Sequence, residues 1–220
     1  MADSLKSRSG PSGGIVSNLN IKIKMFTVLG LDVGIKNLAI CHLDSDGEVV
    51  RWHLADCSTD KKSTISDAIR NVVGYLRTLQ LPNTVVIAIE QQPCGRGRVS
   101  NTTMRCVQAS IEAWALCSQY HYLNFSPARK LGKNAPKQYA ERKKLAVCKV
   151  TDCLKEPWQS FFLKHKKQDD LADAYLIAKQ TILDIEEDRK KTKKRIASQA
   201  LKFVRAKNKR IKNEASSKAS

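Results

Sequence analysis

The chain has 220 residues, of which 42% are hydrophobic, so it can bury one substantial core and still carry appendages outside it. Lys and Arg total 39 against 21 Asp and Glu, and this net charge of +18 predicts a polyanionic partner, above all nucleic acid. The absence of a long apolar run argues against a membrane-spanning helix, and seven cysteines without a CxxC pair indicate free thiols in a reducing intracellular compartment.

The first 24 residues are rich in Ser and Gly and lack the apolar stretch of a secretory signal. We expect a disordered leader over 1–24, with Met25 as a conceivable alternative start. A mitochondrial presequence fits less well, because Asp3 comes early and Arg is scarce.

Three short runs of strand-forming residues come next, at 25–32, 37–43 and 48–54. The turn sequence DSDG joins the last two runs, which predicts a hairpin. Apolar residues then recur at helical spacing over 63–80, and Pro82 follows this segment. The continuous apolar run TVVIAIE at 84–90 is typical of a buried strand at the centre of a sheet.

The second half of the chain predicts a helix over 100–120, a short strand YLNFS and two helices over 137–154 and 169–185. The order βββαβαβα, followed by a last helix, indicates an α/β fold. Its five-stranded mixed sheet combines a three-strand antiparallel meander with parallel strands, flanked by helices.

The C-terminal segment 189–220 contains 13 Lys or Arg residues and one acid, Glu214. Ile196, Leu201, Phe203 and Val204 are interleaved with these charges, a pattern that suits a basic helix docked on a phosphate backbone. A solvated tail or a localisation signal is the alternative. We therefore divide the chain into the leader, a domain over 25–188 and a basic tail over 189–220.

Carboxylates stand at the ends of three predicted elements. Asp32 ends the first strand, Glu90 ends the buried strand, and Asp170 and Asp173 lie one turn apart on the last helix. Neighbouring parallel strands finish at the same edge of a sheet, so these acids can converge there. Four carboxylates so close repel one another by about 4 kcal/mol per pair, and a bound cation removes that cost.

Ligands that are all oxygen favour a hard cation, and a basic protein with such a site is suited to phosphodiester hydrolysis with two Mg²⁺ ions, for which Mn²⁺ can substitute. One ion would activate water and the other would stabilise the leaving 3′ oxygen. Each acid also has an ordinary interpretation: Asp32 as a turn residue, Glu90 as a loop acid, and Asp169 or Asp170 as a helix cap.

The segments GLDVGIKNLA, VVIAIEQQ and KQDDLADAYLIA resemble the three acidic motifs of the RuvC-like Holliday junction resolvases, and IEQQ with DDLADAY is most similar to their poxviral and yeast mitochondrial branch. The resemblance, over about 26–185, implies an RNase H-like fold and a Mg²⁺-dependent endonuclease. It further implies a homodimer that nicks four-way DNA junctions symmetrically, at a viral replication site or in the mitochondrion. Asp32, Glu90, Asp170 and Asp173 match the catalytic tetrad of that family.

Two correspondences stay open. Members of the family place a Lys before the last motif, and here the candidates are Lys130, Lys133, Lys143 and Lys144. Asp169 competes with Asp170, although the spacing to Asp173 favours Asp170. The loop after Glu90 also offers phosphate contacts through Arg96, Arg98 and Arg105, unless it is only a solvated basic loop.

Pairing two nicks across a junction requires two active sites, which predicts a dimer. The helix over 100–120 is the candidate interface, because it carries an apolar stripe of Met104, Val107, Ile111, Trp114 and Ala115; ordinary packing on the sheet is the alternative.

Two other classes of function compete. A nucleic-acid-binding protein without catalysis explains the charge but not the acids. An actin-like ATPase or sugar kinase shares LGLDVGIKN but requires a second such loop and a longer chain.

Overall fold

A five-stranded sheet forms the centre of the molecule. The computed structural model describes residues 26–58, 64–92, 99–132 and 135–217. The strands lie in the order β3-β2-β1-β4-β5, with bounds β1 Thr27–Asp32, β2 Leu38–Leu43, β3 Val49–Ala55, β4 Val85–Glu90 and β5 His121–Phe125. β1, β2 and β3 form an antiparallel meander, and β4 and β5 run parallel to β1. The mixed sheet predicted from the sequence is confirmed.

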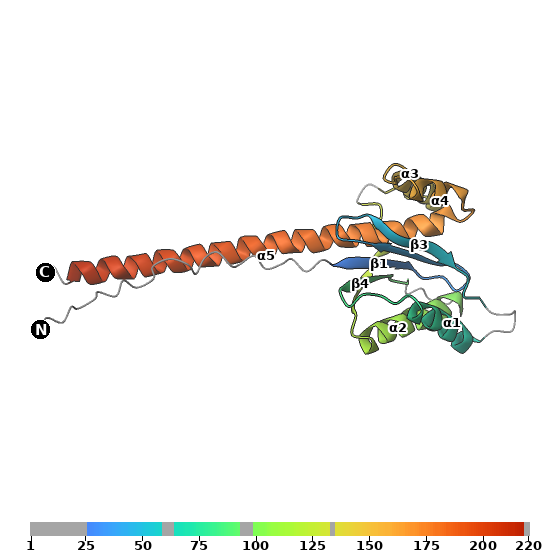
Figure 1. Cartoon of the computed structure of the whole chain (residues 1–220), viewed down its shortest axis with the longest axis horizontal. Coiled ribbons are helices and arrows are strands. Elements are labelled where there is room, and N and C mark those ends of the chain that lie inside the picture. The colour runs from blue at the N-terminus through green and yellow to red at the C-terminus, as the bar shows by residue number, and fades with distance from the viewer. Residues whose placement is uncertain (1–25, 59–63, 93–98, 133–134, 218–220) are drawn as a thin grey trace, which may run out of the picture.

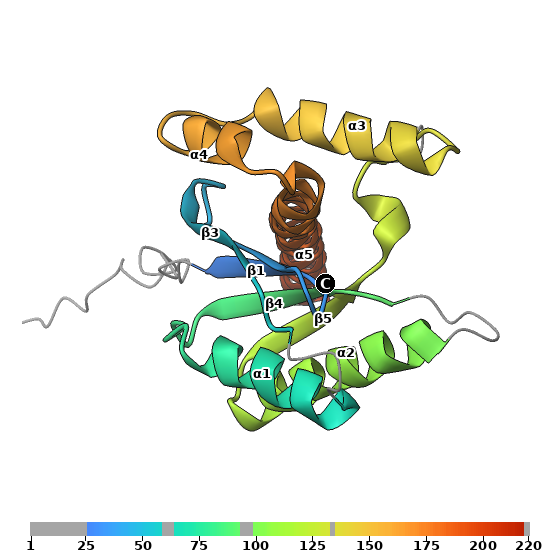
Figure 2. The same cartoon turned by 90° about the vertical axis from the view of Figure 1, so that its right-hand side faces the viewer.

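Helices cover both faces of this sheet (Figures 1 and 2). Helices α1 (Ile65–Arg77) and α2 (Val99–Cys117) lie on one face, and α5 (Gln168–Ser217) begins on the other. Helices α3 (Tyr139–Thr151) and α4 (Trp158–Lys164) pack outside α5, and a 3₁₀ turn, η1 (Pro127–Arg129), follows β5. The arrangement buries both faces of the central strands.

Side-chain alternation along the strands builds two apolar cores. On β1, Leu29 and Leu31 face α1 and α2, whereas Val28 faces α5. β1 and β4 are covered on both faces, so the sequence of each strand is mostly apolar up to the acid at its end. The sequence pattern of these two strands therefore reflects their central position.

The apolar stripe of α2 belongs to this internal core. Val107, Ile111 and Ala115 are fully buried against the sheet and α1, and Met104 and Trp114 pack beside them. The stripe is therefore not available as the interface predicted from the sequence, since one sheet face and α1 already cover it. The outward side of α2 carries the exposed Leu116.

The structure confirms the predicted hairpin turn and shows how the first helix begins. In the DSDG turn, Gly47 has a φ of +84° and donates its backbone N–H to the Asp44 carbonyl at 3.1 Å. At the start of α1, Thr64 accepts from the backbone N–H of Asp67, and the Asp67 carboxylate accepts in return from that of Thr64. These contacts fix the hairpin and the beginning of the helix.

Two helices of the structure differ from the prediction. The short helix α4 was not predicted, because its seven residues give little periodicity, although Phe162 is fully buried. The last helix does not end near Ile185 but continues to Ser217, since no Gly or Pro interrupts it. The proposed boundary at 188 thus falls inside one helix, and the leader lies outside the described residues.

The six cysteines in the described part of the chain form no disulfide, and Cys94 lies outside it. Among the described helices, none combines the length and the apolarity needed to cross a lipid bilayer.

Candidate active site

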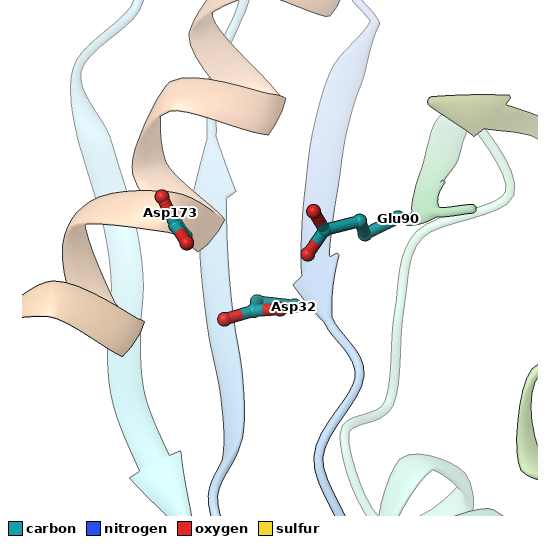
Figure 3. A group of neighbouring side chains, drawn as sticks. All are labelled: Asp32, Glu90 and Asp173. Carbon is teal, nitrogen blue, oxygen red and sulfur yellow. The ribbon is translucent and has the colours of Figure 1, made fainter. Parts of the chain in front are cut away.

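Asp32 and Glu90 lie next to each other at the carboxyl ends of the neighbouring strands β1 and β4. β1 and β4 are parallel neighbours whose last paired residues are Leu31 and Ile89, so the next residue of each strand is the acid. Asp173, from the second turn of α5, approaches the same point, and the three side chains point toward a common centre (Figure 3). One carboxylate oxygen from each of the three lies within 4.8 Å of the others.

Glycine in β1 lets α5 bring Asp173 to this position. A Cβ built on Gly30 would lie 2.3 Å from the backbone oxygen of Ala174 and 2.7 Å from the backbone nitrogen of Ala178, so any larger residue would push the helix away. The indole N–H of Trp52 on β3 donates to the Leu171 carbonyl at 3.1 Å. Both contacts flank Asp173 and set its distance from Asp32.

Lys130, just after the 3₁₀ turn, closes the group of acids. Its amine lies 2.8 Å from a carboxylate oxygen of Glu90 and 2.8 Å from one of Asp173, with only 10% of its side chain exposed. A single buried cation thus bridges two of the three acids. We call Asp32, Glu90, Asp173 and Lys130 the central cluster.

Burial and mutual repulsion shift the pKa values of the central cluster. Burial, with the hydrogen bond and charge of Glu90, raises the pKa of Asp32 well above its usual range. Burial opposes ionisation of Glu90 too, but the Asp32 hydrogen bond and the Lys130 charge bring its pKa below the usual value. Burial apart, the raised pKa of Asp32 and the lowered pKa of Glu90 reflect repulsion between two close carboxyl groups, which a bound cation would relieve.

The neighbouring acids Asp169 and Asp170 have different partners. Asp170 lines the same cleft as the central cluster and accepts from the Asn37 amide at 3.2 Å. Asp169 instead pairs with the amine of Lys143 on α3. Asp170 thus lines the cleft but is not one of the three acids that lie within 4.8 Å of one another, whereas Asp169 is paired with Lys143.

A cleft of about 1330 Å³ opens over the central cluster, between the edge of the sheet, the start of α5 and the segment from η1 to α3. Its floor is acidic, whereas the basic side chains that line it are Lys36, Arg129, Lys130, Lys137, Arg142 and Lys143. Acids that can hold cations, surrounded by Lys and Arg, suit the binding of a phosphodiester backbone.

The structure separates the predicted phosphate-binding residues. Lys130 and Lys143 line the cleft, but Lys144 is exposed on α3 and does not line it. Arg105 is exposed on α2, also away from the cleft lining. Arg96, Arg98 and Lys133 lie outside the described residues.

Sequence reasoning missed several residues that line the cleft. Lys36 and Asn37 stand in the loop right after Asp32, where the motif DVGIKN offered a signal. Gly34 in that loop serves the turn itself, because a Cβ there would lie 2.4 Å from the Asn37 carbonyl oxygen. Tyr139 and Arg142 come from α3 and gave no signal beyond the basic character of that helix.

Comparison with known proteins gives one family and several similar folds. The model of the family described as "Poxvirus A22 protein" matches residues 26–187. Thermus thermophilus RuvC, solved with a Holliday junction substrate, has a TM-score of 0.50 and 16% identity, over 70% of this chain and 90% of that one. This likeness shows that the chain has the RNase H-like fold of RuvC.

Two further solved structures are similar. The fowlpox virus resolvase, solved with substrate Holliday junction DNA, has 15% identity and a TM-score of 0.49, over 71% of this chain and 99% of that one. The yeast mitochondrial Holliday junction resolvase has 21% identity and a TM-score of 0.47, over 69% and 76%. No curated protein sequence matches the chain.

Proposed function

The chain belongs to the family of poxvirus A22 proteins, and from that premise we propose that it is a metal-dependent endonuclease that resolves four-way DNA junctions by paired nicks. The observation that carries the proposal is the convergence of Asp32, Glu90 and Asp173 inside a cleft lined by Lys and Arg. The fold shared with RuvC, which was solved with a junction substrate, supports it.

The acids fit divalent cations. Asp32, Glu90 and Asp173 offer oxygen ligands close together, and Asp170 adds a fourth carboxylate in the same cleft. Such a set suits two Mg²⁺ ions, with Mn²⁺ able to substitute. When bound, the ions would supply an activated water and would stabilise the leaving 3′ oxygen.

The chain's own residues hold and orient the DNA. Lys130 places a positive charge between Glu90 and Asp173, within reach of a phosphate that enters the cleft. Lys36, Arg142 and Lys143 line the cleft and can pair with neighbouring phosphates of the same strand. The basic part of α5 beyond 188 would follow the backbone of a duplex arm.

Resolution into two ligatable duplexes needs nicks on opposite strands, so a homodimer with two-fold symmetry accounts best for the activity. The family is one of poxvirus proteins, which supports a site of viral DNA replication, in host cytoplasm or nucleus, as the place of action.

The test is cleavage of mobile and immobile four-way junctions, with linear duplex beside them and the nick positions mapped. We expect Mg²⁺-dependent nicks at symmetric positions on opposite strands, no cleavage of duplex, and no ATP hydrolysis. Tight binding without nicking in Mg²⁺ or Mn²⁺ would instead establish a binding protein without catalysis.

A further inference from the structure

Tyr139 is an aromatic side chain that the chain leaves in solvent at the edge of the cleft. It occupies the first position of α3, and 64% of its surface is exposed. Among the exposed large apolar side chains of the described residues, Tyr139 is the one that lines the cleft. The ring belongs to neither of the two apolar cores.

Two cations of the same helix accompany the ring. The guanidinium of Arg142 lies 5.9 Å from the ring centroid, and the amine of Lys143 lies 5.1 Å from it. Lys143 also pairs with Asp169, the residue beside Asp170 in the first turn of α5. The ring and its cations are thus tied to the helix that carries the catalytic acids.

An exposed aromatic ring beside cations has the composition of surfaces that hold unpaired nucleotides. A base stacks on the ring while the cations contact the phosphates on either side of it. In linear duplex every base is already stacked between its neighbours, so such a ring gains no partner there. At a branch point, where the arms separate, a base can leave its stack at lower cost.

We propose that Tyr139 is a stacking site for a nucleobase displaced next to the branch point, with Arg142 and Lys143 holding the adjoining phosphates. The site deepens the proposed function, on which it rests, because it names a contact that separates branched from linear DNA. Its ligand is an unpaired deoxynucleotide of either purine or pyrimidine type, since every base offers a π face.

The first experiment measures affinity for a four-way junction and for a duplex of equal length at one salt concentration, in the Asp32→Asn background that prevents cleavage. Tyr139→Ala should weaken junction binding about tenfold and leave duplex binding unchanged, and Tyr139→Phe should bind like the parent because it keeps the ring. Leu163→Ala, which removes an exposed apolar side chain from α4 outside the cleft, is the control and should change neither affinity.

The second experiment detects the contact directly. A 5-iododeoxyuridine next to the branch point is irradiated in the complex, and the cross-linked peptide is identified by mass spectrometry. We expect cross-linking to Tyr139, and none when the same base lies within an arm far from the branch.

Three results would overturn the proposal: junction affinity unchanged in Tyr139→Ala, equal loss in Tyr139→Phe and Tyr139→Ala, or cross-linking to residues other than Tyr139. Failure of the proposed function looks different, since the parent chain would then fail to nick junctions in Mg²⁺ or Mn²⁺, or would show no preference for junctions over duplex. In that case the same cross-link on a single-stranded oligonucleotide still decides whether Tyr139 stacks on a base.

Discussion

The amine of Lys130 lies 2.8 Å from a carboxylate oxygen of Asp173, and this ion pair joins the segment after β5 to the start of α5. The same amine holds Glu90, so one positive charge offsets much of the repulsion within the central cluster. A divalent cation bound by these acids would likewise offset their repulsion. The effects of Lys130 and of metal on stability should therefore depend on each other.

Lys130→Met should lower the free energy of unfolding in EDTA by about 3 kcal/mol, because it leaves the buried Glu90 and the partly buried Asp173 without their cation. Saturating Mg²⁺ should raise the melting temperature of this variant more than that of the wild type, as measured by calorimetry. Lys144→Met, which removes an exposed lysine of α3, controls for the loss of one positive charge. Equal Mg²⁺ shifts in wild type and Lys130→Met would contradict the coupling.

Asp32→Asn, Glu90→Gln and Asp173→Asn should each reduce junction cleavage to background while junction affinity stays near that of wild type. In the proposed function the acids would hold metal, whereas Lys and Arg would hold DNA. Titration with Mn²⁺ in a calorimeter should show the loss of metal binding directly. A parallel loss of cleavage and DNA affinity, with metal binding intact, would show that these acids are not the ligands.

Asp170→Asn should be as severe as Asp173→Asn, because Asp170 faces the cleft. Asp169→Asn should reduce cleavage only about tenfold, through the loss of its pairing with Lys143. Cleavage rates at saturating junction measure the difference between these two neighbours. If Asp169→Asn is the more severe of the two, the assignment within the last motif is off by one residue.

Truncation after Arg189 should weaken binding to junctions and duplex alike, because the phosphate contacts that it removes do not depend on the shape of the DNA. It should also make the affinity less dependent on salt concentration. Arg189 is retained, since its guanidinium lies 4.3 Å from the ring centroid of Phe26. Affinities over a series of salt concentrations provide the slopes. Loss of the preference for junctions at matched occupancy would assign recognition of the branch to the tail.

Light scattering should give a mass near twice 24.6 kDa. A cruciform plasmid cut by limiting enzyme should yield mostly linear product, because both strands are cut within one binding event. A monomer that releases mainly nicked circles would refute paired cleavage and leave the metal chemistry unaffected.

The sequence predicted the sheet well because its strands carry strong local signals. The apolar runs that end in Asp32 and Glu90 and the turn at Gly47 define β1, β4 and the hairpin without reference to the rest of the chain. The sequence predicts a separate tail beyond 188, because the charge and the apolar pattern change there. The backbone hydrogen bonding does not change, so the structure has one continuous helix.

The cleft was harder to predict, since its walls come from segments distant in sequence. Nothing local indicates that Lys130 bridges Glu90 and Asp173, or that Lys143 pairs with Asp169. The misassigned stripe of α2 has the same origin: its residues are apolar in any environment, and only the packing shows whether strands or a second chain cover them.

Asp173 and the basic tail lie on the same continuous helix, α5, so the tail extends a fixed distance from this acid. From Asp173 to Ser217 there are about 44 residues of α-helix, or about 66 Å at 1.5 Å per residue. That length corresponds to about 19 base pairs of duplex at 3.4 Å each. Helix α5 extends away from the sheet (Figure 1), so an arm of DNA held along it would keep a fixed position relative to the scissile phosphate over almost two turns of double helix. One residue inserted into α5 beyond the sheet would turn the far charges by about 100° around that axis while the carboxylates stayed in place.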